Sequence, residues 1–258
     1  MVNINPTPSK QQQAQTETTK VGSYKLTTES FLLSFKGKVT LPTLFNYLIG
    51  AASKHASEHG FGFEEMTGRE TAWVLSRIAI EMDAFPGLSE EIIIHTWVEE
   101  VNKFFTCRNF EILNNQGKRM GLARSIWAAI DLQTRKPSLL NIDLLTPFLE
   151  NRPCPISKMG KIKPIEAATE GVPYRVKYSD LDINKHLNSA KYIEHLLDLF
   201  PIEKFEKQDI KRFEIMYIAE GRYDMELLLH HAVEDSHTDI LAVCNEDKAI
   251  CRAKISWK

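Results

Sequence analysis

The chain has 258 residues, of which 43% are hydrophobic and 26% are charged, and its formal net charge is −2. These values are typical of one large or two small globular domains, and they disfavour a nucleic-acid-binding protein, which usually has a basic surface. The four cysteines form no CxxC pair and no apolar run is long enough to span a membrane, so we predict a cytoplasmic protein with no disulfide framework, metal site or membrane span.

The first 22 residues are rich in Gln and Thr and contain no aromatic residue, no Arg and no apolar run. This composition predicts a disordered tail and disfavours a secretory or organellar signal. An extended segment is expected from Tyr24 to Phe35. A helix is then predicted from Thr40 to His59, ending at Gly60. Its apolar residues recur on one face: Leu41, Leu44, Phe45, Leu48 and Ala52.

Strand-like segments follow this helix. Ile78, Ile80 and Met82 alternate with charged residues, which predicts a half-buried strand. Three more strands are expected because β-branched and aromatic residues are frequent in Ile92–Val101, Phe104–Leu113 and Leu122–Asp131.

Residues 147–172 are rich in Pro and are predicted to link two units. From Asn151 to Ile165 this segment has four basic residues, among them Lys158, Lys161 and Lys163, and no acidic residue. A solvated linker accounts for this composition, and a docking strip for an acidic partner is the alternative.

The second half repeats the order of the first. A strand is predicted over Tyr174–Tyr178, a helix begins after Asn188 and stops before Pro201, and Phe213–Ala219 alternates like a strand. Three further strands are expected at Met225–Val233, Ile240–Cys244 and Ala249–Trp257. One helix followed by antiparallel strands, twice over, predicts an α+β protein with duplicated units at residues 23–146 and 173–258.

A dense polar cluster precedes the second helix, from Asp180 to Asn188. Asn188 suits the N-cap, but capping requires only one or two side-chain acceptors and leaves the rest of the cluster without a structural role. The cluster lies at the positive end of a helix dipole, where a polarised carbonyl or an attacking water could be held. Glu220 is predicted to end the strand Phe213–Ala219, directly before Gly221, and taken alone it would be interpreted as a solvated acid.

The sequence Asp180–Ile193, DLDINKHLNSAKYI, resembles the signature of the acyl-ACP thioesterases of plants and bacteria. Further segments resemble that family in the same order, and the similarity extends from Lys25 to Trp257. They are Thr43–Tyr47 and Ala51–Ala56 in the first helix, the tryptophan strand Trp73–Arg77, and the later strands at Thr96–Val98 and Arg124–Trp127.

The resemblance implies a tandem hotdog fold, in which two antiparallel sheets each wrap a long helix, and hydrolysis of fatty acyl thioesters of acyl carrier protein (ACP). It places the catalytic residues at Asp182, Asn184, His186 and Glu220. The sequence indicates no metal or organic cofactor. The first unit would then bind the acyl chain. The candidate substrate-binding residues are Leu44, Phe45, Leu48, Trp73, Leu75, Trp97 and Asn188.

The chain departs from many plant members, which have a cysteine directly after the glutamate, because it has Gly221 there. A cysteine nucleophile is therefore disfavoured. We expect direct attack by water with Glu220 or Asp182 as base. His186 would assist proton transfer, Asn184 would position water or the carbonyl, and backbone N–H groups at the helix start would polarise the thioester oxygen.

Two alternatives to this function remain open from the sequence. The same fold could serve an acyl-CoA thioesterase, or a non-catalytic acyl-binding protein, although a mere binder would not need all four polar residues. The acyl chain length, and whether the protein is a monomer or a homodimer, also stay open.

Overall fold

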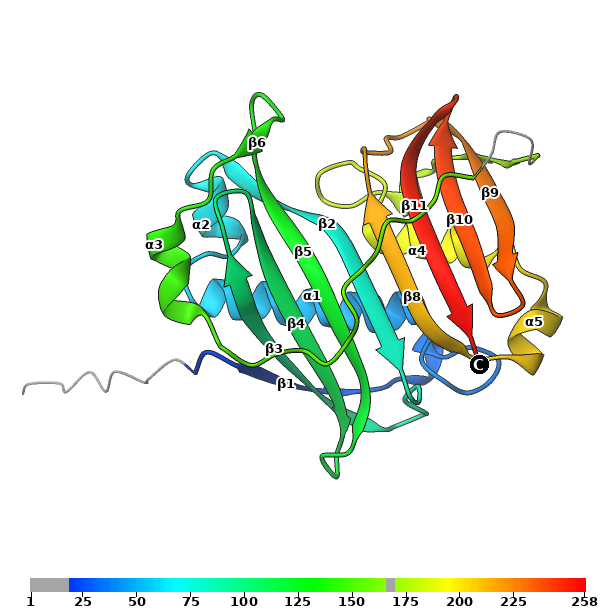
Figure 1. Cartoon of the computed structure of the whole chain (residues 1–258), viewed down its shortest axis with the longest axis horizontal. Coiled ribbons are helices and arrows are strands. Elements are labelled where there is room, and N and C mark those ends of the chain that lie inside the picture. Colours follow the sequence, from blue (N-terminus) through cyan, green and yellow to red (C-terminus); the bar gives the residue numbers. More distant parts are fainter. Residues whose placement is uncertain (1–18, 166–169) are drawn as a thin grey trace, which may run out of the picture.

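A computed structural model describes residues 19–165 and 170–258 of the chain. Its strands form one antiparallel sheet in the order β1-β3-β4-β5-β2-β8-β11-β10-β9-β7, with β6 paired to β5. The first half of the chain forms one half of this sheet and the second half forms the other (Figure 1). This is the tandem hotdog fold. The predicted tail falls largely on residues 1–18, which lie outside the described residues; Gly22 already begins β1.

The first unit is built around a helix of 18 residues. The Thr40 side chain caps it by accepting a hydrogen bond from Thr43 N–H (3.3 Å), and Gly60 follows its end with a φ of +74°. The helix lies behind the strands of this unit in Figure 1. The elements are β1 (Gly22–Thr27), α1 (Leu41–Glu58), α2 (Phe63–Thr67), β2 (Thr71–Met82), β3 (Glu91–Val101), β4 (Phe105–Asn114), β5 (Arg119–Asp131), β6 (Pro137–Ser138) and α3 (Ile142–Leu145).

The second unit has a shorter helix than the first, of nine residues, although the resemblance implied a long one. It ends at Leu197, before Pro201, which is the N-cap of the next helix. Pro is unfavourable in a helix interior because it lacks the backbone N–H. The elements are β7 (Val172–Arg175), α4 (Ser189–Leu197), α5 (Ile202–Lys207), β8 (Ile210–Tyr217), β9 (Glu226–Asp235), β10 (Thr238–Asn245) and β11 (Lys248–Trp257). Short 3-10 turns lie at Ser30–Leu32, Thr146–Phe148 and Tyr178–Asp180.

The two predicted sheets join edge to edge into one sheet, and the two units share one core. Strand β2 pairs with β8, with Ile78 opposite Ile215 and Ile80 opposite Phe213. These four side chains are buried together with the apolar faces of α1 and α4, which also pack against each other. Burial of this continuous apolar surface fixes the two units relative to one another.

The segment between the units is not a solvated linker along its whole length. It crosses the face of the sheet opposite α1 (Figure 1), and Cys154 and Ile156 are buried there against Trp97. Ile162 is also buried. The basic side chains of Lys158 and Lys161 are exposed. Among the residues with described coordinates, no helix is both long and apolar enough to span a membrane.

Candidate active site

The four predicted catalytic residues line one cavity of about 540 Å³ at the junction of the units. Both units contribute to its wall. The second unit provides Asp182, Asn184, His186, Asn188 and Glu220, and the first provides Phe45, Trp73, Leu75 and Arg135. The cavity therefore joins a polar side from one unit to a largely apolar side from the other.

Asp182 organises the loop that carries Asn184 and His186. Its carboxylate Oδ1 accepts hydrogen bonds from the backbone N–H groups of Asn184 (2.8 Å) and His186 (3.1 Å). Its own backbone N–H donates to the carbonyl of His186 (2.8 Å), and Lys185 adopts a φ of +61° within this tight loop. Local side-chain bonds of this kind are the usual role of Asp in turns. The structure thus gives Asp182 a positioning role for the two residues that follow it.

Glu220 lies in the loop after β8, three residues beyond Tyr217, and so it does not end the strand as predicted. Its carboxylate forms an ion pair with Arg135 of the first unit, and Arg222 Nη2 lies 3.7 Å away. The Oε2 atom of Glu220 lies 3.2 Å from His186 Nε2. Glu220 and His186 therefore form an acid–imidazole pair.

The pKa of His186 is lowered from its usual value, first because the imidazole is partly buried and then because Arg135 and Arg222 are close. The negative charge of Asp182 acts in the opposite direction and raises this pKa. The net lowering keeps the imidazole neutral near pH 7, so His186 can accept a proton.

The start of α4 offers one free N–H group to the cavity. Asn188 is the N-cap, and its Oδ1 accepts from Ala190 N–H (2.8 Å). The N–H groups of Lys191 and Tyr192 donate to the carbonyl of Asn188. Of the first four N–H groups of the helix, only that of Ser189 has no acceptor among the described residues, and Ser189 lines the cavity. The sequence predicted several free N–H donors at the start of this helix, and the structure leaves one of them free.

Gly221 stands where a cysteine would clash with its neighbours. Its N–H donates to Tyr192 Oη (2.9 Å), and an added Cβ would lie 2.9 Å from that oxygen and 3.0 Å from Leu187 Cβ. The neighbouring side chains therefore leave no room for a Cβ atom at this position, and glycine fits it.

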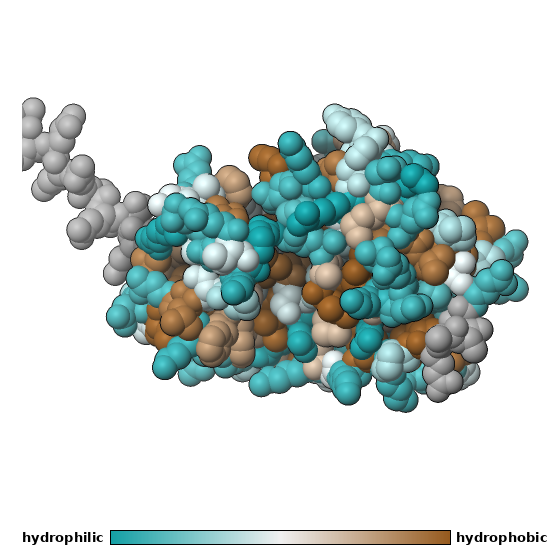
Figure 2. All heavy atoms as spheres, turned by 90° about the horizontal axis from the view of Figure 1, so that it is seen from above, coloured by the Kyte–Doolittle hydropathy of each residue, from teal (hydrophilic) through white to brown (hydrophobic). Residues whose placement is uncertain are grey.

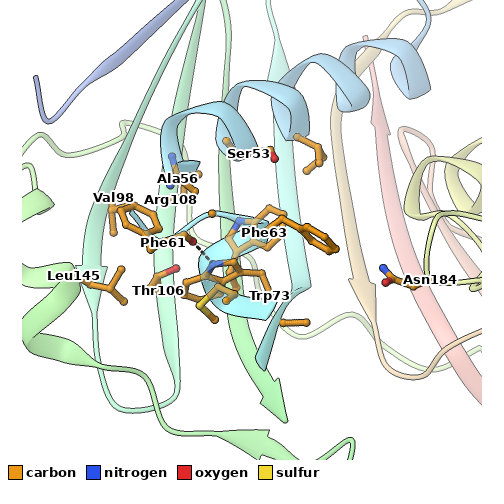
Figure 3. A pocket seen from close by; sticks show the side chains of 16 residues that line it. Ser53, Ala56, Phe61, Phe63, Trp73, Val98, Thr106, Arg108, Leu145 and Asn184 are labelled. Carbon is orange, nitrogen blue, oxygen red and sulfur yellow. Dashed lines mark hydrogen bonds between the residues drawn. The ribbon is translucent and has the colours of Figure 1, made fainter. Parts of the chain in front are cut away.

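A second cavity of about 170 Å³ extends the first into the N-terminal unit. The two cavities share Ile49, Ala72, Trp73, Trp127 and Asn184 in their walls. Figure 3 shows Asn184 at one end of the second cavity and Val98, Leu145 and Arg108 toward the other, with Trp73 and Phe63 between them. An apolar space of this kind suits an extended hydrocarbon chain.

The structure does not bring all predicted substrate-binding residues to these cavities. Phe45, Trp73, Leu75 and Asn188 line the larger one. Leu44 and Leu48 are fully buried in the shared core and line neither cavity. Trp97 packs on the opposite face of the sheet, where its Nε1 donates to the carbonyl of Arg152 (2.6 Å).

The sequence analysis did not identify Arg135, which is the charged residue that the first unit contributes to the larger cavity. It lies in the turn between β5 and β6 with a φ of +59°. Its backbone N–H donates to the carbonyl of Asp131 (2.9 Å), which helps to fix the turn. No motif marks this arginine, and its partner Glu220 is 85 residues away in the chain. Only the pairing of the two units brings them together.

Comparison with known protein families supports this description of the site. Family models for the acyl-ACP thioesterase N-terminal and C-terminal domains match residues 21–148 and 163–258, respectively. The chain therefore belongs to the acyl-ACP thioesterase family. Among solved structures, it is similar to an acyl-ACP thioesterase from Bacteroides thetaiotaomicron, with 40% identity and a TM-score of 0.87 over 93% of this chain and 98% of that one.

More distant relatives include plant enzymes. The chain is 26% identical over 233 residues to a chloroplastic palmitoyl-ACP thioesterase of Gossypium hirsutum, covering 85% of this chain and 56% of that protein. The chain thus spans about half the length of the curated relatives it matches. The 12:0-ACP thioesterase of Umbellularia californica shares the fold, with a TM-score of 0.84 at 20% identity over 93% of this chain and 97% of that one.

Proposed function

We propose that the protein hydrolyses fatty acyl-ACP thioesters to a free fatty acid and holo-ACP. The observation that carries this proposal is the pair His186–Glu220 at the polar side of a cavity whose apolar part continues into the N-terminal unit. A thioester carbonyl held beside this pair would leave its acyl chain in the apolar part. Family membership and the names of the relatives support the same substrate class.

Water is the nucleophile in this mechanism. Glu220, with His186 beside it, orients a water molecule and accepts one of its protons while the oxygen attacks the thioester carbon. The tetrahedral intermediate then breaks its C–S bond, and the accepted proton passes to the leaving sulfur through His186. The products are a carboxylic acid and the free thiol, so all atoms balance. No covalent acyl-enzyme is formed.

The other polar residues position the reacting atoms. The carboxamide of Asn184 has no partner among the described residues and lines both cavities, so it is available to the carbonyl or the water. The free N–H of Ser189 at the positive end of α4 is available to the developing oxyanion. Asp182 holds the loop and is not the base.

The test is the release of free thiol from a series of acyl-ACPs of increasing chain length and from the matching acyl-CoAs. His186→Ala serves as the control for contaminating activity. Preference for acyl-ACP, lost in the variant, supports the proposal and identifies the chain length. Equal or faster turnover of acyl-CoA would make the protein an acyl-CoA thioesterase. Ligand binding without release from either thioester would make it a non-catalytic acyl-binding protein.

The monomeric or dimeric state and the cytoplasmic location remain predictions from the sequence. The division into units at residues 23–146 and 173–258 also remains a prediction.

A further inference from the structure

Arg108 carries a buried charge on a strand face that it shares with apolar core residues. It lies on β4, and the side chains two and four residues further along, Phe110 and Ile112, are fully buried in the core beneath α1. By strand alternation, Arg108 faces the same way. Its exposed fraction is 4%, and it lines the inner cavity of about 170 Å³.

The charge of Arg108 is not neutralised by the protein. Its Nη1 donates to His55 Nδ1 (3.1 Å) and to Thr96 Oγ1 (3.1 Å). Because an arginine can only donate, His55 accepts through Nδ1 and therefore carries its proton on Nε2, which faces the carbonyl of Lys20 (3.2 Å). Burial, together with the charge of Arg108, lowers the pKa of His55 to about 3, so this imidazole is neutral. Arg108 forms no ion pair with any carboxylate in the described parts of the chain.

Arg108 also has N–H groups that make no hydrogen bond within the described residues. The guanidinium has three more N–H groups, on Nε and Nη2, and none of them has an acceptor among residues 19–165 and 170–258. No Arg108 atom is among the fully enclosed side-chain atoms that lack a partner, so these N–H groups are open to the cavity, where water or a ligand can accept them. Since Arg108 lines the cavity, such an acceptor would come from whatever occupies it.

The cavity extends from the catalytic loop toward this arginine. Asn184, from the catalytic loop, lies at one end of the cavity, and Arg108 lies toward the other with Val98 and Leu145 (Figure 3). Most of the wall between them is apolar, including Ile49, Phe63 and Trp73. A chain whose thioester lies beside His186 would therefore present its last carbons to the guanidinium.

We propose that the inner end of this cavity is a subsite for an oxygen-bearing chain end, so that Arg108 selects acyl groups that carry a hydroxyl or, more strongly, a carboxylate at the carbon furthest from the thioester. A terminal oxygen accepts the free N–H groups, and a carboxylate also cancels the charge. A terminal methyl group does neither. This inference rests on the proposed function in one respect, namely that an acyl chain occupies the cavity.

The test measures binding and not turnover. The probes are acyl-pantetheine amides, in which an amide replaces the thioester so that they cannot be hydrolysed as substrates. They are prepared at several chain lengths, each with a methyl, hydroxyl or carboxyl end, and their Kd values are measured by calorimetry. At the best-fitting length, we expect a carboxyl end to bind the wild-type protein at least about tenfold more tightly than a methyl end, the lower range for a hydrogen bond to a charged group.

Two variants complete the design. Arg108→Met keeps a long apolar side chain and should remove or reverse the preference. Arg124→Met, in the same sheet but paired with Glu99, should leave it unchanged. A wild-type preference for methyl ends at every length would overturn the proposal and make Arg108 a structural core residue, even if the Arg108 variant failed to fold. A carboxyl preference that Arg108→Met retains would overturn it as well.

The failure of this proposal can be distinguished from the failure of the proposed function. Preferential binding of oxygen-ended probes without hydrolysis of any thioester would preserve the subsite and overturn the catalytic proposal. Hydrolysis of acyl-ACP together with a uniform methyl preference would do the reverse.

Discussion

Arg135 of the first unit forms an ion pair with Glu220 of the second, across the junction of the two units. The turn that carries Arg135 is held by Asp131, whose Oδ1 accepts hydrogen bonds from the N–H groups of Gln133 (3.1 Å) and Thr134 (2.7 Å). The charge beside the acid of the C-terminal unit is therefore set by local structure in the N-terminal unit. In consequence, neither unit alone completes the site.

Glu220 and His186 should behave as one functional pair. We expect Glu220→Gln or His186→Ala to lower kcat for thioester hydrolysis about 10²–10⁴-fold, because each removes a proton-transfer group. The double variant should be little worse than either single variant, since groups that act as a unit are not additive. The measurement is thiol release from acyl-ACP. Glu226→Gln, an exposed acid paired with Arg175, is the matched control, and a near-normal rate for Glu220→Gln would remove that acid from the mechanism.

The pH dependence of kcat/KM should shift in opposite directions in two variants. The acid limb of the profile is expected to rise as His186 loses its proton, since the neutral imidazole is the active form. Arg135 lowers the pKa of His186, so Arg135→Gln should raise this pKa and move the limb to higher pH. Asp182 raises the same pKa, so Asp182→Asn should move the limb to lower pH.

Arg175→Gln, an exposed arginine paired with Asp224, should leave the pH profile in place and serves as the control for loss of a surface charge. If the Arg135 and Asp182 variants shift the acid limb in the same direction, the limb does not report His186.

Much of this structure could be predicted from local sequence, because its elements have local causes. The helix Leu41–Glu58 follows from apolar residues at helical spacing and from its Thr40 cap. The predicted strands Ile240–Cys244 and Ala249–Trp257 are joined by a tight turn at Asn245–Asp247, with Glu246 at a φ of +52°. The cluster at Asp182 was visible because its density of polar residues exceeds what capping requires.

The structural features that could not be predicted from the sequence depend on long-range contacts. Pairing of β2 with β8 merges two sheets that the sequence presents as separate repeats. Arg108 contacts His55, which is 53 residues away, so no local pattern shows its role. Leu44, Leu48 and Trp97 were predicted as substrate contacts, but apolar character does not distinguish a core residue from a cavity wall.

Gly221→Ala should destabilise the protein by about 1–3 kcal/mol, as expected for an added carbon in a packed site. The new Cβ would contact Tyr192 Oη and Leu187, and relief of that contact would disturb the hydrogen bond from the backbone N–H of residue 221 to Tyr192. The measurement is the free energy of unfolding in urea. Gly160→Ala is the control, since nothing lies within 4 Å of its added Cβ, and equal stability of the two variants would show that position 221 is not tightly packed.

Ala56→Leu should shorten the preferred acyl chain. Ala56 is buried on α1, lines the inner cavity, and lies near Arg108 in Figure 3, so a leucine there would fill the space that the end of a long chain occupies. For the longest chain that the wild-type protein accepts, kcat/KM should fall about tenfold or more, because a pocket that misfits one methylene loses about 1–3 kcal/mol. Shorter chains, which do not reach Ala56, should be hydrolysed at the wild-type rate, and this separates cavity filling from general damage. Ala84→Leu, the same substitution at an exposed position outside both cavities, should change neither rate. A uniform loss over all chain lengths in Ala56→Leu would mean that the acyl chain does not enter this cavity.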